Sequence, residues 1–245
     1  VHELPESSLT ARGRALTNIL DLPEDEKIRA FVSLRDFEQD AYLIMTTRSG
    51  IIKKTKLEEY SRPRANGIIA INLKSNDELI AVRTSSGSDE ILISTKLGQA
   101  IRFNEDKVRS VGRNSMGVKG ISLKSDDFVV SSEVIKDSKT QILTITENGF
   151  GKRTEVEKYR LTSRGGKGVT TLKITEKTGK IVNAFQVDNE TDVILLSSVG
   201  KANRLKASEI SIIGRATQGV RLMKLNEETW VVAAAKLTEE KQNSE

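Results

Sequence analysis

Basic residues recur at a fixed distance from a series of glycines in this chain. In four segments a glycine is followed, four positions later, by lysine or arginine, and a second glycine closes the basic segment. Lysine and arginine at such positions can bind anions, because both donate charge-assisted hydrogen bonds to phosphate and carboxylate oxygens. The first pairs are Gly50 and Lys54, Gly98 and Arg102, Gly149 and Arg153, and Gly200 and Arg204, and the closing glycines are Gly67, Gly117, Gly168 and Gly219.

Residue types that catalyse reactions or bind metals do not converge in the sequence. The chain has one histidine, His2, and no cysteine, which excludes a histidine-based triad, a thiolate nucleophile and a histidine-rich metal site. Asp and Glu are plentiful, but they recur in turns and form no paired-carboxylate pattern. The segment from Arg164 to Gly168 resembles a phosphate-binding loop, but Gly168 stands where a Walker motif needs serine or threonine. We therefore expect no catalytic residue, no metal and no cofactor.

The glycines define an internal repeat with a period of 48, 51 and 51 residues. Each unit holds about four short runs rich in Val, Ile, Leu and Thr, bounded by Gly, Asn, Asp and Ser, which is typical of strands. Gly98 and Gly149 stand where a tight hairpin needs a positive φ. No window has apolar residues at helical spacing, so little helix is expected. Four strands in about 50 residues, in tandem, predict an all-β propeller-like fold with four-stranded blades.

The repeats also set the expected boundaries. Residues 11–34 match only the second half of a repeat, so about five blades are represented and the chain starts within one of them. We expect a single domain over residues 1–237 and a polar, disordered tail over residues 238–245. No apolar run approaches 18 residues and no signal segment is found. The lack of cysteine is compatible with a cytoplasmic protein.

Positive charge is concentrated between the two glycines of each repeat. The chain carries a net charge of +5, but residues 48–64, 96–119, 147–167 and 198–221 together carry +15, which leaves −10 for the rest. If the repeats surround an axis, their basic loops lie on one rim as a continuous positive band. Aromatic residues make up only 4% of the chain. Such a band suits the phosphates of double-stranded DNA better than single strands, whose bases stack on aromatic side chains.

Three segments resemble a known family: VHELPESSLTARGRALTNIL at residues 1–20, NGFGKRTEVEKY at 148–159 and SEISIIGRATQGV at 208–220. On these segments the chain resembles, over essentially its whole length, the C-terminal domain of the DNA gyrase A subunit. The corresponding domain of topoisomerase IV is a close relative of that family. The resemblance implies a β-pinwheel of six blades that exchange strands with their neighbours and wrap DNA around a basic perimeter.

The resemblance also implies a role without catalysis. The domain would support ATP-dependent negative supercoiling by a type IIA topoisomerase whose active sites lie outside this chain. Its partners would be DNA and, in an A2B2 enzyme at the bacterial nucleoid, the B subunit together with the rest of the A subunit. The isolated domain would be a monomer.

The chain departs from the family's hallmark box, which is glutamine, two basic residues, two glycines, a basic residue and glycine. Arg164 to Gly168 matches its last five positions, but Thr162 and Ser163 occupy the first two, and this loop belongs to a later repeat. The box itself is expected upstream of Val1. For this chain the resemblance therefore implies DNA binding and leaves a full wrap open.

The basic residues of the loops are the predicted phosphate contacts. For any single one of them, a solvated surface position is the alternative. A propeller scaffold for protein partners also stays open, as does a topoisomerase IV-type domain that binds DNA without a full wrap. The predicted contacts are Lys53, Lys54, Arg62, Arg64, Arg102, Arg109, Arg113, Lys152, Arg153, Arg160, Arg164, Lys167, Arg204, Arg215 and Arg221, with the backbone amides of Gly165, Gly166 and Gly168.

Overall fold

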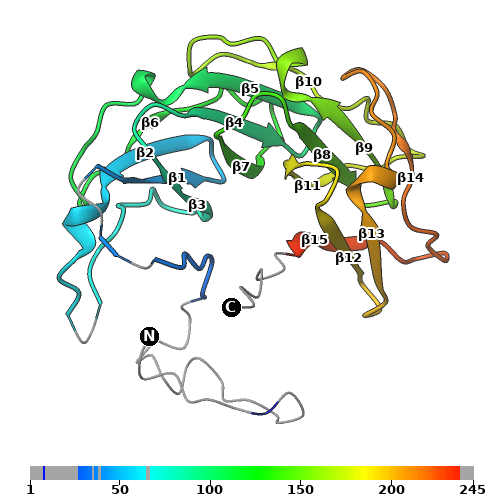
Figure 1. Ribbon diagram of the computed structural model, residues 1–245, viewed down its shortest axis with the longest axis horizontal. Coiled ribbons are helices and arrows are strands. Elements are labelled where there is room, and N and C mark those ends of the chain that lie inside the picture. Colours follow the sequence, from blue (N-terminus) through cyan, green and yellow to red (C-terminus); the bar gives the residue numbers. More distant parts are fainter. Residues whose placement is uncertain (1–7, 9–26, 35, 38–39, 65–66, 238–245) are drawn as a thin grey trace, which may run out of the picture.

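The apolar runs of each repeat form β-strands, as the sequence predicts. Figure 1 shows four sheets side by side along an open arc in the computed structural model. The predicted partial repeat over residues 11–34 lies largely outside the described residues, and its described part, 27–34, contains no strand. The predicted tail, 238–245, also lies outside them. The structure describes residues 8, 27–34, 36–37, 40–64 and 67–237.

Two strands of each repeat are joined by a hairpin at the first glycine. β1 (Tyr42–Thr47) and β2 (Ile51–Lys56) pair antiparallel around Gly50, whose φ is 81°. The glycines predicted at the later hairpins also have positive φ, which confirms the expected turn geometry. The later pairs are β4 (Glu90–Thr95) with β5 (Gln99–Asn104), β8 (Gln141–Thr146) with β9 (Phe150–Glu155), and β12 (Asp192–Ser197) with β13 (Ala202–Lys206).

A third strand follows the acidic turn of each repeat and pairs with the first strand on the side of the arc's centre (Figure 1). The acidic turns are fastened to the hairpins. The Asp77 carboxylate accepts hydrogen bonds from the Ser49 amide, at 2.9 Å, and from the Ser49 hydroxyl. The Asp127 carboxylate accepts one from the Leu97 amide at 2.9 Å. The third strands are β3 (Leu79–Ser85), β7 (Val129–Ile135), β11 (Ile181–Val187) and β15 (Val231–Leu237).

The outermost strand of each of the first three sheets comes from the following repeat. β6 (Val118–Lys119) pairs with β2, β10 (Val169–Thr170) with β5, and β14 (Val220–Arg221) with β9. The closing glycine precedes each of these strands for a steric reason. At Gly117 φ is 96°, and a Cβ there would lie 2.4 Å from the carbonyl oxygen of Ile52. The strand exchange implied by the family resemblance is thus present, and it explains the second glycine.

Helix is confined to short 3-10 turns in the described part of the chain, as expected. Each turn follows the second strand of a hairpin and carries acidic residues. No helix among the described residues is long and apolar enough to cross a bilayer. The turns are η2 (Leu57–Tyr60), η3 (Glu105–Lys107), η4 (Val156–Lys158) and η5 (Ala207–Glu209).

The core lies between adjacent sheets. Ile44 and Ile52 of the first sheet pack in one cluster with Ile91, Ile93 and Phe103 of the second. Consecutive residues of β4 are fully buried, because the second sheet has a neighbour on each face. The isoleucine-rich runs therefore stack blade against blade.

The fourth sheet differs from the other three. It has three strands, in the order β13, β12, β15, so four-stranded blades are confirmed for three of the four sheets. No outer strand pairs with β13 among the described residues. In β12, Val193 and Leu195 are buried, whereas Leu196 is 40% exposed. One face of this sheet is therefore less covered than the faces of the sheets inside the arc.

Candidate nucleic-acid interface

The basic residues four positions after the first glycines are mostly buried. Lys54, Arg102 and Arg153 are 6%, 8% and 4% exposed. Each stands opposite a residue of the next repeat in a parallel bridge: Ser110, Leu161 and Ile212, respectively. The prediction that these three side chains contact phosphate is therefore wrong, because the next repeat covers them.

Arg102 shows what this position does instead. Its Nε lies 2.6 Å from Glu90 Oε2, and its Nη1 donates to the carbonyl oxygens of Val156 and Tyr159 at 3.0 and 3.1 Å. These carbonyls belong to the first residue of η4 and to the residue directly after that turn, both in the next repeat. The guanidinium thus joins two neighbouring blades. Arg153 repeats the arrangement, with Nε donating to Ile210 O at 2.8 Å at the end of η5.

Each of these cations also has a partner twelve residues earlier in the opposite strand of its hairpin. Lys54 lies over the Tyr42 ring at 4.3 Å and forms an ion pair of 3.0 Å with Glu105 of the next repeat. In the fourth repeat Arg204 pairs with Asp192, but its side chain is 58% exposed. The twelve-residue partners are Tyr42, Glu90, Gln141 and Asp192.

Lys53 and Lys152 are also buried, both at 0% exposure. Their ammonium groups donate to main-chain carbonyls of the following repeat's basic loop. Burial lowers the pKa of Lys53 and of Lys152 to about 8 in each case. The prediction that they contact phosphate is wrong for the same reason as above: they face the protein interior.

Ten of the predicted basic residues stay accessible, which is the set we call the rim cations. Three of them lie 51 residues apart and are half-buried: Arg113, Arg164 and Arg215. The Nη1 of each donates to a backbone carbonyl of a neighbouring segment at 2.9–3.1 Å. The other seven are exposed: Arg62, Arg64, Arg109, Arg160, Lys167, Arg204 and Arg221.

The loop from Arg164 to Gly168 supplies fewer free amides than expected. The Gly165 N–H donates to Gly120 O at 2.6 Å, so the prediction that it binds phosphate is wrong. Gly168 has φ of 73°, and a Cβ there would lie 2.3 Å from Ala100 O, so the strand exchange alone requires this glycine. The Gly166 and Gly168 amides stay candidates for phosphate.

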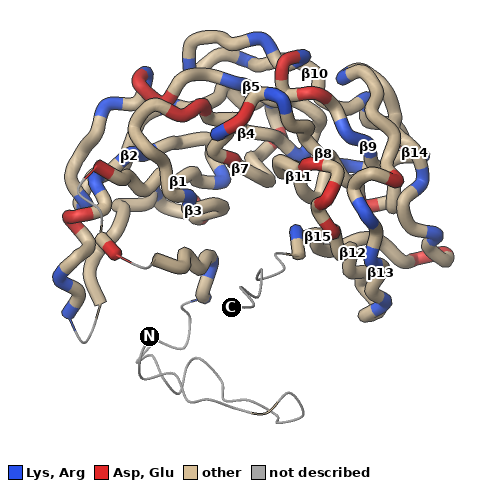
Figure 2. The backbone as a smooth tube through the Cα atoms, in the orientation of Figure 1, with Lys and Arg blue, Asp and Glu red and all other residues tan. Residues whose placement is uncertain are grey.

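Eight of the rim cations lie on loops that join the 3-10 turns to the outermost strands, whereas Arg204 lies in β13 and Arg221 in β14. Figure 2 shows Lys and Arg spaced along the outside of the arc near β2, β10 and β14. It also shows Asp and Glu between them, because the 3-10 turns carry residues such as Glu58, Asp106 and Glu157. The positive band is therefore interrupted once per blade.

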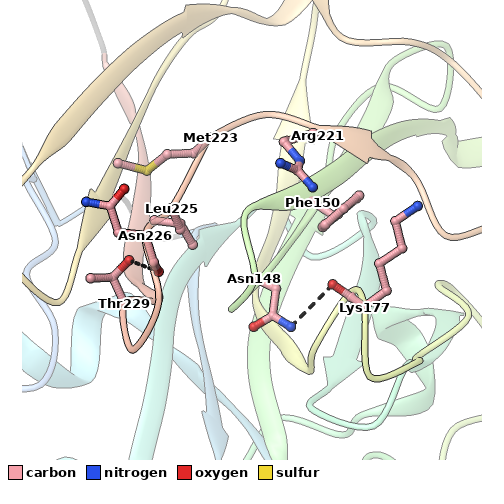
Figure 3. Close-up of a pocket in the computed structure, with 8 residues that line it drawn as sticks. All are labelled: Asn148, Phe150, Lys177, Arg221, Met223, Leu225, Asn226 and Thr229. Atoms are coloured by element: carbon pink, nitrogen blue, oxygen red, sulfur yellow. Dashed lines mark hydrogen bonds between the residues drawn. The ribbon is translucent and has the colours of Figure 1, made fainter.

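Two exposed cations, Lys119 and Lys177, are not among the predicted phosphate contacts. Lys119 lies in the outer strand β6 at the repeat position of Arg221 in β14, a signal that the spacing of the closing glycines could have given. Arg221 and Lys177 flank the Phe150 ring at 5.3 and 5.5 Å. Figure 3 shows both cations beside this ring, at the edge of a cavity of about 250 Å³ that Met223 and others line.

The repeats match a protein family along most of their length. The family model described as DNA gyrase C-terminal domain, beta-propeller, matches residues 41–86, 89–136, 140–188 and 191–237. The chain belongs to this family. The resemblance read from the three sequence segments is thereby confirmed, and the gyrase C-terminal fold accounts for the four blades.

Individual gyrase proteins agree with this assignment. The A subunit of DNA gyrase from Salmonella typhimurium is 45% identical over 239 residues, which is 98% of this chain and 27% of that protein. The A subunit of the Staphylococcus epidermidis gyrase is 45% identical over 244 residues, which is 99% of this chain and 27% of that protein. The chain therefore spans about a quarter of the length of the curated relatives it matches.

Solved structures share the fold. The C-terminal domain of DNA topoisomerase IV has a TM-score of 0.89 at 28% identity, covering 97% of this chain and 74% of that one. The DNA gyrase A C-terminal domain has a TM-score of 0.84 at 28% identity, covering 93% of this chain and 76% of that one. The number of six blades stays a prediction.

Proposed function

We propose that this chain binds double-stranded DNA along its outer rim, with little base preference, and bends and wraps it. The rim cations carry this proposal, because successive blades place accessible lysine and arginine side chains along the outside of the arc. Lysine and arginine bind phosphates regardless of base sequence, so an edge lined with them can bind the DNA backbone. Membership in the gyrase C-terminal family supports the same ligand.

The number of exposed rim cations sets the expected strength and salt dependence of DNA binding. Bending a site of 20–30 base pairs costs on the order of 1–6 kcal/mol, which several phosphate contacts must offset. If the seven exposed rim cations each neutralise one phosphate, log affinity falls against log salt with a slope of about −6. Affinity would then drop on the order of 10³- to 10⁴-fold between about 50 and 200 mM salt.

The wider role follows from the family. The chain acts without chemistry of its own, as the DNA-binding part of the A subunit in a gyrase-type enzyme that also contains the B subunit. That enzyme works at the bacterial nucleoid. The chain needs no metal or cofactor, and the cleavage and ATP sites lie in other parts of the enzyme. Its contribution to supercoiling is to present a bent duplex to the catalytic core.

A topoisomerase IV-type role, binding without a full wrap, is the second candidate. The TM-score of 0.89 to that enzyme's C-terminal domain favours it. The two are separated by incubating the chain with relaxed circular DNA and a nicking-closing enzyme. A shift in linking number supports wrapping, and gel retardation without a shift supports binding alone. No retardation at low salt would contradict both.

A further inference from the structure

Two fully buried lysines hold basic loops of the following repeat. Lys53 in β2 donates from Nζ to Ala70 O at 2.6 Å and to Arg113 O at 2.7 Å. Arg113 lies in the loop between Gly112 and Gly117, which belongs to the next repeat. The ammonium therefore binds the backbone at the same residue whose guanidinium belongs to the rim cations.

Lys152 in β9 repeats this arrangement two blades further on. Its Nζ donates to Gly214 O at 2.5 Å, to Arg215 O and to Thr217 Oγ1 at 3.1 Å. The loop it holds carries Arg215, the repeat equivalent of Arg113. Three acceptors match the three donors of an ammonium group, so this charge is fully hydrogen-bonded in the interior.

Packing alone does not require a charge at this position. In the second repeat the same position is Ile101, which is 2% exposed, and in the fourth it is Asn203. Burying an ammonium group is costly unless hydrogen bonds compensate it, whereas an apolar side chain fits the equivalent strand. The ammonium thus serves its carbonyl partners.

The equivalent loop of the third repeat lies over Ile101, not over a buried lysine, and is held by other hydrogen bonds. In this loop of the third repeat, the Gly165 N–H donates to Gly120 O at 2.6 Å, and Ser122 Oγ donates to Gly165 O at 2.7 Å. Arg164 adds hydrogen bonds to two more carbonyls. Each of the three loops is therefore fixed, but only the loops of Arg113 and Arg215 are held by a buried lysine.

We propose that Lys53 and Lys152 are positioning residues for DNA binding, which clamp the loops of Arg113 and Arg215 in the conformation that meets phosphate. This inference rests on the proposed function. A pre-ordered loop loses less conformational entropy when DNA binds, so the clamps raise affinity without touching the ligand. The lowered pKa of each lysine, about 8, leaves the ammonium form predominant at neutral pH.

The test is the double variant K53M/K152M of the 245-residue chain, compared with Ile101→Met as the matched apolar control. We expect the affinity of the double variant for a linear duplex to fall at least about fivefold. The slope of log affinity against log salt should change by less than about 0.5, whereas two lost phosphate contacts would reduce it by about 1.8. A change of slope near that value would overturn the positioning role.

Trypsin cleavage without DNA reads the loops directly. Mass spectrometry should show faster cleavage after Arg113 and Arg215 in the double variant, with cleavage after Arg164 unchanged. Unaltered cleavage after Arg113 and Arg215, or unaltered affinity, would refute the clamps. If the wild-type chain failed to bind DNA, the proposed function would fall, while the cleavage rates would still decide whether the lysines hold the loops.

A second variant keeps the charge and guards against misfolding. Thr217→Val removes one acceptor of Lys152, together with the hydrogen bond that the Thr217 hydroxyl donates to Gly214 O at 2.8 Å, and leaves every cation in place. We expect faster cleavage after Arg215 only, and about twofold weaker DNA binding at an unchanged salt slope. Wild-type cleavage after Arg215 in this variant would contradict the role of the Lys152 contacts, even if the double variant did not fold.

Discussion

Replacing Arg102 with methionine separates a bracket between blades from a phosphate contact. The guanidinium is buried and bonds Glu90 Oε2 and the carbonyls of Val156 and Tyr159. Methionine would leave the carboxylate without its cation and two buried carbonyls without these donors. We expect R102M to destabilise the fold rather than to weaken DNA binding directly.

The magnitude follows from these contacts. Hydrogen bonds to charged groups contribute about 1.5–3 kcal/mol each, and breaking a buried pair costs about 3–5 kcal/mol. Glu90 is 22% exposed, so water recovers part of the loss. We therefore expect unfolding to become easier by about 2–4 kcal/mol, which corresponds to a melting temperature lower by about 5–15 °C for a domain of this size.

Thermal denaturation and DNA titration of R102M and of Arg109→Met together decide the question. Arg109 is an exposed rim cation, so its loss should leave the melting temperature unchanged and reduce the salt slope by about 0.9. R102M should show the opposite pattern when it is titrated well below its melting temperature. If R102M melts like the wild type and loses affinity with a shallower slope, Arg102 contacts phosphate and does not join the blades.

Three further outcomes are expected. The wild-type salt slope should be about −6, and a value shallower than about −2 would contradict a rim with several phosphate contacts. The folded pKa of Lys53 and of Lys152 is about 8, below the ordinary value of 10.5, so the unfolded chain binds more protons and these lysines make stability rise with pH above about 8. Urea denaturation of wild type and K53M/K152M between about pH 8 and 9.5 should show a smaller rise in the variant, and parallel curves would exclude this linkage. Gly117→Ala should detach β6, because its Cβ would lie 2.4 Å from Ile52 O at a φ of 96°; faster amide exchange in β2 would report the loss, and unchanged exchange would contradict it.

The repeat pattern predicted most of the fold because its causes are local. A glycine with positive φ at Gly98 and the apolar runs beside it specify a hairpin from a few neighbouring residues. The acidic turn around Asp127 is likewise readable, since its carboxylate binds the hairpin next to it. Family membership was also readable, because it rests on specific segments rather than on geometry.

Which cations are buried could not be predicted from the sequence, because the burial of each depends on a neighbour about 50 residues away. Lys53 and Lys54 are adjacent in β2, so their side chains point to opposite faces of the strand. This alternation by itself predicts that at least one of the two side chains is exposed to solvent. Both are buried, since the loop of the next repeat covers one and its 3-10 turn meets the other. A clue was present in the sequence: Glu90 and Asp192 stand twelve residues before Arg102 and Arg204, as a paired partner across a hairpin would.

The sequence by itself determined the period, the strands, the hairpins and the family, since these depend on residue types at short spacing. Only the tertiary structure decided which cations join blades, as Arg102 and Lys152 do, and which stay accessible, as Arg109 and Arg160 do. The physical reason is strand exchange: the outer wall of each of the first three blades is built by the following repeat. A side chain's access to solvent is therefore set by a segment that its own neighbours in sequence do not reveal.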